Sequence, residues 1–168
     1  MNYCVYKLTF PQGAHFGNGT LDETSFTFPA DKLFSALYIE ALKAGCEGTL
    51  LESAEKGRLL LSDALPFVGS QYLVPKPILY VERAKKSDVE DRKKYKKRKY
   101  LTLAELDAYM DGTLNLSDDP MAQFGMESSQ TKIHLIPGED AMPYYVGAYH
   151  YRRGNGLYLI LVYRLSES

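Results

Sequence analysis

The hydrophobic pattern of the chain changes its period early, and this change restricts the fold more than any other feature. Residues 3–10 alternate as in a β-strand, which puts the even-numbered side chains from Cys4 to Phe10 on one inward face. Residues 29–44 instead repeat apolar side chains at helical spacing. Strand-like runs return later in the chain, so the sequence predicts helices packed on a sheet.

Two helices are expected between the first strand and the next. The first spans about residues 29–44, because a proline suits its first turn and Gly45 suits its end. Thr49 and Glu52 have the spacing of a capping box for a second, short helix that Gly57 ends.

The second half of the chain mixes strand, helix and loop signals. Residues 58–67, RLLLSDALPF, are expected to form a strand. Residues 75–80, PKPILY, are typical of extended chain, because each proline restricts the residue before it. Thr102 and Glu105 repeat the capping-box spacing at the start of a further helix. Residues 111–143 are punctuated by Gly, Pro and Asp, so we expect an irregular, mobile loop there.

The chain closes with residues 144–165, YYVGAYHYRRGNGLYLILVYRL, which are two strand-like runs joined by RGNG. Asn155-Gly156 is a strong signal for a hairpin turn between them. The order of strand, helix, helix, strand, insertion and hairpin predicts an α+β fold with a largely antiparallel sheet. A length of 168 residues suits one domain, or half of a duplicated two-domain protein.

Membrane and export signals are weak. The N-terminus lacks an uninterrupted apolar stretch, and the longest apolar run, LYLILVY at residues 157–163, is far too short to span a membrane. Cys4 and Cys46 lie far apart without a CxxC spacing, which favours buried thiols over a disulfide or a metal site. We therefore expect a soluble protein in the reducing cytoplasm.

Charge is distributed unevenly along the chain, although the net charge is only −1. Residues 83–99 hold 10 of the 20 Lys and Arg against 3 acidic residues, so this segment carries +7 and the remainder −8. Tyr95 and Tyr100 interleave with the basic run that begins at Arg92, a combination that suits single-stranded nucleic acid. The alternative is a solvated helix whose order of charges complements the helix dipole.

A helix over this segment would divide its basic residues between two faces. One face would hold Lys93, Lys96, Lys97 and, one turn on, Tyr100. The other would hold Lys94 and Arg98. We expect the first of these faces to contact phosphates.

The glycine-rich stretch at residues 13–19, GAHFGNG, follows directly on the first strand. Its spacing fits neither the dinucleotide fingerprint nor the P-loop, so we expect no nucleotide cofactor. On its own, it is best explained as a connection that needs positive φ at two or three positions. His15 has no catalytic partner in a visible motif, and His134 and His150 are too widely spaced to indicate a metal site.

Five ordered stretches of the sequence point to a known family. They are YKLTF..GAHFGNGTLDET, FPADKLFSALYIEAL, LLLSDALPF, YLVPKPILY and KKYKKRKYL. From about residue 3 to 109, and again at YHYRRGNGLYLIL, the chain resembles the N-terminal half of the fourth Csm subunit. That subunit belongs to the type III-A CRISPR effector complex and to the RAMP superfamily of RNA-binding proteins.

The resemblance implies a ferredoxin-like βαββαβ RAMP domain, related to the RNA-recognition motif. It also implies a non-catalytic subunit that holds the 5′ tag of the CRISPR RNA. Its protein partners would be the large polymerase-like subunit and the first backbone RAMP subunit. Family members are nearly twice as long and have a second ferredoxin-like half. The resemblance therefore covers the first half, and the sequence is compatible with an N-terminal fragment, a split subunit or a truncated protein.

The predicted RNA-binding residues combine the basic segment, the glycine loop and the expected hairpin turn. They are His15, Gly17, Gly19, Lys76, Lys93, Lys96, Lys97, Arg98, Tyr100, Arg152 and Arg153. The loop would let bare backbone approach RNA phosphates. One alternative is a metal-independent endoribonuclease of the same superfamily, with His15 as general acid or base. Another is a structural scaffold with a solvated basic helix.

Overall fold

The computed structural model describes residues 2–17, 19–79, 81, 89–116, 118–138 and 140–164. The sequence predicted a basic insertion at about residues 83–100, and residues 83–88 of that segment lie outside these ranges. The fold is α+β with antiparallel strand pairing, as the sequence predicted. No helix in the described ranges is long and apolar enough to cross a membrane.

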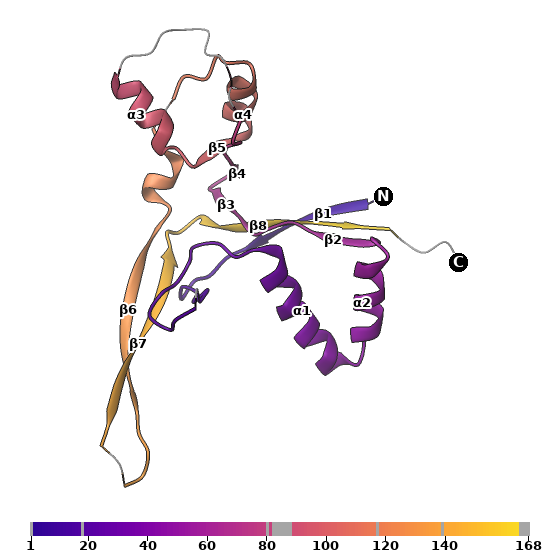
Figure 1. Cartoon of the computed structure of the whole chain (residues 1–168), viewed down its shortest axis with the longest axis vertical. Coiled ribbons are helices and arrows are strands. Elements are labelled where there is room, and N and C mark those ends of the chain that lie inside the picture. Colours follow the sequence, from indigo (N-terminus) through magenta and orange to yellow (C-terminus); the bar gives the residue numbers. More distant parts are fainter. Residues whose placement is uncertain are drawn as a thin grey trace.

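The main sheet is built around β8, the last strand of the chain (Figure 1). Its strands are, in spatial order, β1 (Asn2–Leu8), β8 (Asn155–Tyr163), β3 (Leu65–Val68), β4 (Gln71–Pro75) and β5 (Tyr100–Thr102), with β2 (Leu59–Leu61) also beside β8. Every pairing is antiparallel. The first and last strands of the chain therefore lie side by side.

Two helices connect β1 to β2. α1 (Ala30–Ala44) begins directly after Pro29, and Gly45 ends it in the left-handed conformation with φ of 68°, as predicted. α2 (Glu47–Glu55) begins earlier than the sequence suggested, so Thr49 lies inside the helix and the predicted capping box there is wrong. Gly57 follows the end of α2 with φ of 62°, in agreement with its predicted role as a stop.

A long hairpin forms the second sheet. β6 (Gly125–His134) pairs with β7 (Met142–Tyr151) along its whole length and projects away from the main sheet (Figure 1). A short 3-10 helix, η1 (Pro120–Gln123), precedes it. The prediction of an irregular loop over residues 111–143 is therefore wrong for both elements. Most of β6 is exposed, so burial did not impose the apolar alternation that would have revealed a strand.

The predicted hairpin turn at Asn155-Gly156 is also wrong. Both residues belong to β8. The turn between β7 and β8 lies just before them and is closed by a hydrogen bond from Asn155 N–H to the Arg152 carbonyl. β7 pairs with β6, whereas β8 crosses into the main sheet. A Cβ at Gly156 would collide with the Leu8 carbonyl oxygen, so this glycine permits close strand packing and makes no turn.

An aromatic core joins the two sheets. Phe124 and Tyr149, from the hairpin side, pack with Ala64 and Leu157 of the main-sheet side. Half-buried aromatic side chains surround this core and are Phe10, Phe16, Phe26, Phe28 and Tyr151. Ring contacts such as Phe26 with Tyr149, whose centroids lie 5.7 Å apart, hold the hairpin base against the sheet.

A smaller core holds the remaining two helices, α3 (Val89–Lys97) and α4 (Leu103–Met110), against β5. The capping box predicted for α4 is confirmed: Thr102 Oγ1 accepts from Glu105 N–H, and the Glu105 carboxylate accepts from Thr102 N–H. Leu101 and Tyr109 are buried in this core.

Candidate RNA interface

The basic helix α3 is anchored through Tyr95, which faces the protein. The Tyr95 ring stacks on Tyr109, with centroids 5.8 Å apart and planes 16° apart. Lys76 reaches across from the end of β4, donates to the Tyr95 carbonyl at 2.6 Å, and lies 4.9 Å from the centre of the Tyr95 ring. The lysines of α3 therefore project from a helix that is fixed to the sheet.

Lys76 therefore has a structural position. Burial lowers the pKa of Lys76, and the nearby charge of Arg98 lowers it further. Its ammonium group is engaged by the Tyr95 carbonyl and ring, so we leave Lys76 out of the proposed RNA interface.

Among the basic side chains that the structure describes in this region, residues 93–99, the exposed ones are all lysines. They are Lys93, Lys94, Lys96, Lys97 and Lys99. Lys97 lines the same cleft as Lys94 and Arg98, together with Asp118 and Asp119, so the predicted division of the helix into two faces is wrong for Lys97.

Arg98 is the clearest departure from the predicted interface. Its side chain is 3% exposed, its Nη1 lies 3.5 Å from Glu105 Oε1, and its Nη2 donates to the Asp118 carbonyl at 3.3 Å. Asp119 Oδ1 also lies near this guanidinium, 3.7 Å from Nη1. A guanidinium enclosed in this way is not available to a phosphate, which argues against the contact predicted for Arg98.

Tyr100 does not lie on the helix, because α3 ends at Lys97 and Tyr100 begins β5. Its ring packs edge-on against Phe26, with centroids 6.0 Å apart. Burial raises the pKa of the Tyr100 phenol, while a hydrogen bond with Thr27 opposes that shift. The predicted helical face that joined Tyr100 to Lys96 and Lys97 is therefore wrong.

The glycine loop is explained mainly by contacts within the protein. Gly13 and Gly19 have positive φ, 82° and 107°, which confirms the prediction of two such positions. A Cβ on Gly13 would meet the His150 ring at 2.8 Å, and one on Gly17 would meet His15 Nε2 at 3.0 Å. Only at Gly19, among these three, is the space around a Cβ open.

His15 is exposed and lies beside the hairpin. Its Nδ1 is 2.7 Å from the Gly147 carbonyl of β7, and Ala14 pairs with Tyr149 through backbone hydrogen bonds. The Lys32 ammonium donates to the Gly17 carbonyl at 2.7 Å, which adds a positive charge that sequence reasoning missed. In the described part of the chain, no three His, Cys, Asp or Glu side chains gather in a way that could hold a metal.

The two arginines after β7 have different environments. Arg152 Nη1 donates to Gln123 Oε1 at 2.8 Å, and its backbone N–H bonds the Phe124 carbonyl. Arg153 is exposed, and the described residues offer its guanidinium no hydrogen bond or ion pair.

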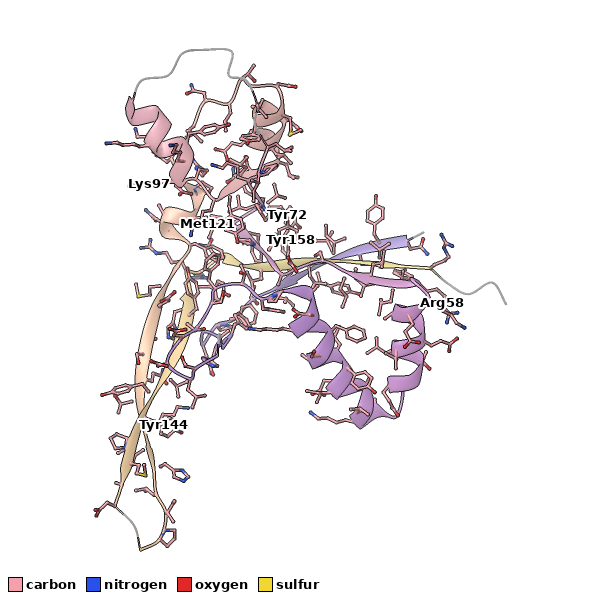
Figure 2. The ribbon with its side chains drawn as sticks, in the orientation of Figure 1. Arg58, Tyr72, Lys97, Met121, Tyr144 and Tyr158 are labelled. Carbon is pink, nitrogen blue, oxygen red and sulfur yellow. The ribbon has the colours of Figure 1, made fainter. Side chains whose placement is uncertain are left out.

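The short helix η1 connects the separate parts of the predicted interface. Asp119 caps η1 and neighbours Arg98 at the end of α3, while Gln123 at its other end holds Arg152. Figure 2 shows Lys97 and Met121, of α3 and η1, on the same side of the molecule. The structure thus brings the basic helix and the Arg152–Arg153 turn together, with the glycine loop farther along β7.

Sequence comparisons identify curated proteins that are similar to this chain. No family model matches the chain. The CRISPR system Cms protein Csm4 of Mycobacterium tuberculosis (strain CDC 1551 / Oshkosh) is 36% identical over 170 residues, which cover 99% of this chain and 55% of that protein. The chain thus spans about half the length of the curated relative.

Solved structures share the fold. A Csm1-Csm4 cassette in complex with cA4 matches with a TM-score of 0.65 and 23% identity, covering 96% of this chain and 59% of that one. A Csm3-Csm4 subcomplex of the type III-A CRISPR-Cas interference complex matches with a TM-score of 0.58 and 16% identity, covering 100% and 60%. The resemblance in the sequence is confirmed, and the chain belongs to the Csm4 family of CRISPR proteins.

Proposed function

We propose that this chain is a CRISPR RNA-binding subunit of a type III-A interference complex and holds the 5′ tag of the guide RNA. The observation that carries the proposal is the row of exposed lysines on and after α3. The helix is anchored through Tyr95, so these charges are displayed from a fixed position. Fixed cations that neutralise successive phosphates bind the RNA backbone without reading its sequence.

The RNA path that fits the geometry starts at α3 and passes η1 to the turn at Arg153. Lys93, Lys96 and Lys97 would contact the backbone at one end, and Arg153 at the other. His15 and the bare backbone around Gly19 would extend the path along β7.

The proposed protein partners are a large Csm1-type subunit and a Csm3-type backbone subunit. Csm4 relatives occur in structures with each of these proteins. The chain outside residues 83–99 carries −8, so surfaces away from α3 suit protein contacts better than RNA contacts.

A ferredoxin-like architecture is the finer fold proposal. The main elements follow the order βαββ, which begins with β1 and helices α1 and α2, continues with the β2–β3 strands and ends with β8. In the sheet, β8 lies between β1 and the β2–β3 strands. Among the described residues β1 pairs only with β8, and an apolar groove of about 580 Å³ lies between the helices and the end of β8. A complete ferredoxin-like βαββαβ domain would have a second helix over this groove and a further strand beside β1.

We also propose that the chain has no catalytic activity of its own. The competing function is an endoribonuclease with His15 as general acid or base. His15 has its Nδ1 committed to the Gly147 carbonyl, and its Nε2 faces Gly17, so one ring nitrogen already has a structural partner.

Incubation of the protein with labelled single-stranded repeat RNA separates the possibilities. Binding that weakens with salt, with the RNA left intact, is the result expected for an RNA-binding subunit. Cleavage of the RNA would establish the endoribonuclease instead. Absence of binding at low salt would leave a scaffold with a solvated basic helix and overturn the proposal.

A further inference from the structure

A cleft at the turn between β7 and β8 offers more than a charged surface. It has a volume of about 400 Å³ and lies where residues 9–11, after β1, meet residues 151–155. Small-molecule sites in proteins begin at about 300 Å³ and combine apolar walls with a few placed polar groups. A single nucleotide is a ligand of this size.

The apolar wall of the cleft is a pair of aromatic rings. Phe10 and Tyr151 stack with centroids 5.2 Å apart and planes 28° apart. The Tyr151 hydroxyl donates to the Phe26 carbonyl at 2.6 Å, and Phe16 packs edge-on against Phe10 at 5.5 Å. Rings held in this way form a rigid platform on which a base can stack without ordering a flexible side chain.

The polar wall carries a cation suited to phosphate. Arg153 lines the cleft, is exposed, and has no hydrogen bond or ion pair with the described residues. Its neighbour Arg152 is held by Gln123 and fixes the backbone of the turn. A guanidinium binds phosphate oxygens with two parallel hydrogen bonds, which a lysine cannot do.

Asn155 adds a directional group. Its Nδ2 donates to the carbonyls of Gln123 and Phe124, at 3.1 Å each. With the amide nitrogen used inside the protein, Asn155 can offer a ligand only its carbonyl oxygen, which is an acceptor. The amino group of a base such as adenine is a matching donor.

We propose that this cleft binds one nucleotide of single-stranded RNA, with the base against Phe10 and Tyr151 and the phosphate at Arg153. The inference rests on the proposed function, RNA binding, and adds to it a fixed position for one base. The α3 lysines neutralise the backbone, whereas the cleft sets the register of the strand.

The test uses the isotope-labelled chain and follows its backbone amides by NMR during titration with adenosine 5′-monophosphate. Saturable shifts are expected at Thr9, Arg153 and Gly154. Ribose 5-phosphate should bind about tenfold more weakly or worse, because it lacks the stacking base. Arg153→Ala should weaken nucleotide binding about tenfold through the lost charged hydrogen bonds, whereas Lys43→Ala, on distant α1, should not change it.

Several outcomes would overturn the inference. Equal affinities for the nucleotide and for ribose 5-phosphate would mean an anion site without base recognition. Shifts elsewhere on the protein, or none, would mean that the cleft is not a nucleotide site. These results are separable from failure of the proposed function, because RNA binding that depends on the α3 lysines would survive them. Absence of RNA binding altogether would instead overturn the function itself.

Discussion

Nη1 of Arg98 lies 3.5 Å from Oε1 of Glu105, in a region where the two side chains are only 3% and 12% exposed. The same Glu105 carboxylate accepts from Thr102 N–H at 2.9 Å and so closes the capping box of α4. A single buried arginine therefore ties the end of α3 to the start of α4. Its role is to hold α3, the helix that carries the lysines, in a fixed position.

Arg98→Ala should destabilise the fold by about 3 kcal/mol, because removal of one partner leaves a buried carboxylate uncompensated. Urea unfolding measures the change, and Lys97→Ala serves as the control because its side chain is exposed. Equal midpoints for the two variants would contradict the structural role assigned to Arg98.

Four half-buried or buried tyrosines should titrate later in the folded chain than in the unfolded chain. Burial raises the pKa of each of them, and they are Tyr100, Tyr149, Tyr151 and Tyr158. Since these pKa values exceed the ordinary value of 10.0, the unfolded chain loses these protons first as pH rises. Their contribution to the free energy of unfolding is complete below that pH and falls above it.

Ultraviolet absorbance of tyrosinate follows this titration, with the chain in denaturant as the reference. A native curve with a delayed portion above pH 10, accompanied by falling stability, is expected. Superimposable native and denatured curves would show that the aromatic core is open to water.

Gly156→Ala should destabilise the fold by about 1 to 3 kcal/mol, because the new Cβ would collide with the Leu8 carbonyl and force β1 away from β8. Gly48→Ala is the matched control: Gly48 lies in α2 with nothing within 4 Å of a Cβ, so alanine should stabilise the helix. Denaturant unfolding compares both with the unchanged chain. A neutral Gly156→Ala would contradict the strand packing.

His15→Ala should weaken RNA binding only modestly, since His15 is one contact among several and performs no proton transfer. Fluorescence anisotropy of labelled RNA measures the affinity, and gel analysis of the same samples across pH measures cleavage. The prediction fails if the unchanged chain cleaves RNA with a pH dependence that the substitution abolishes.

Local sequence signals predicted the elements whose ends are set by backbone chemistry. Gly45 and the Thr102–Glu105 pair identified helix ends, because capping depends on residues within one turn. The pairing of β8 with β1 could not be read in this way, since it joins residues from opposite ends of the chain. The same limit led to the mistaken hairpin at Asn155-Gly156.

The sequence predicted that basic side chains would form the candidate site, but it did not predict which of them are buried. The basic run identified the lysines of α3, whereas the burial of Arg98 depends on Asp118, Asp119 and Glu105, which come from later segments. The aromatic cleft was missed because Phe10 and Tyr151 meet only after the chain has folded. The aromatic and basic stretch YHYRR was the available signal.

The salt dependence of RNA binding tests the central claim most directly. Log affinity for single-stranded RNA falls with log salt by about 0.7 for each phosphate neutralised. Combined alanine substitution of Lys93, Lys96 and Lys97 should therefore reduce the slope by about 2. A control with the same loss of charge, alanine at Lys43, Lys56 and Lys132, should keep the slope of the unchanged chain. Equal slopes for the two triple variants would contradict the account and leave α3 a solvated surface helix.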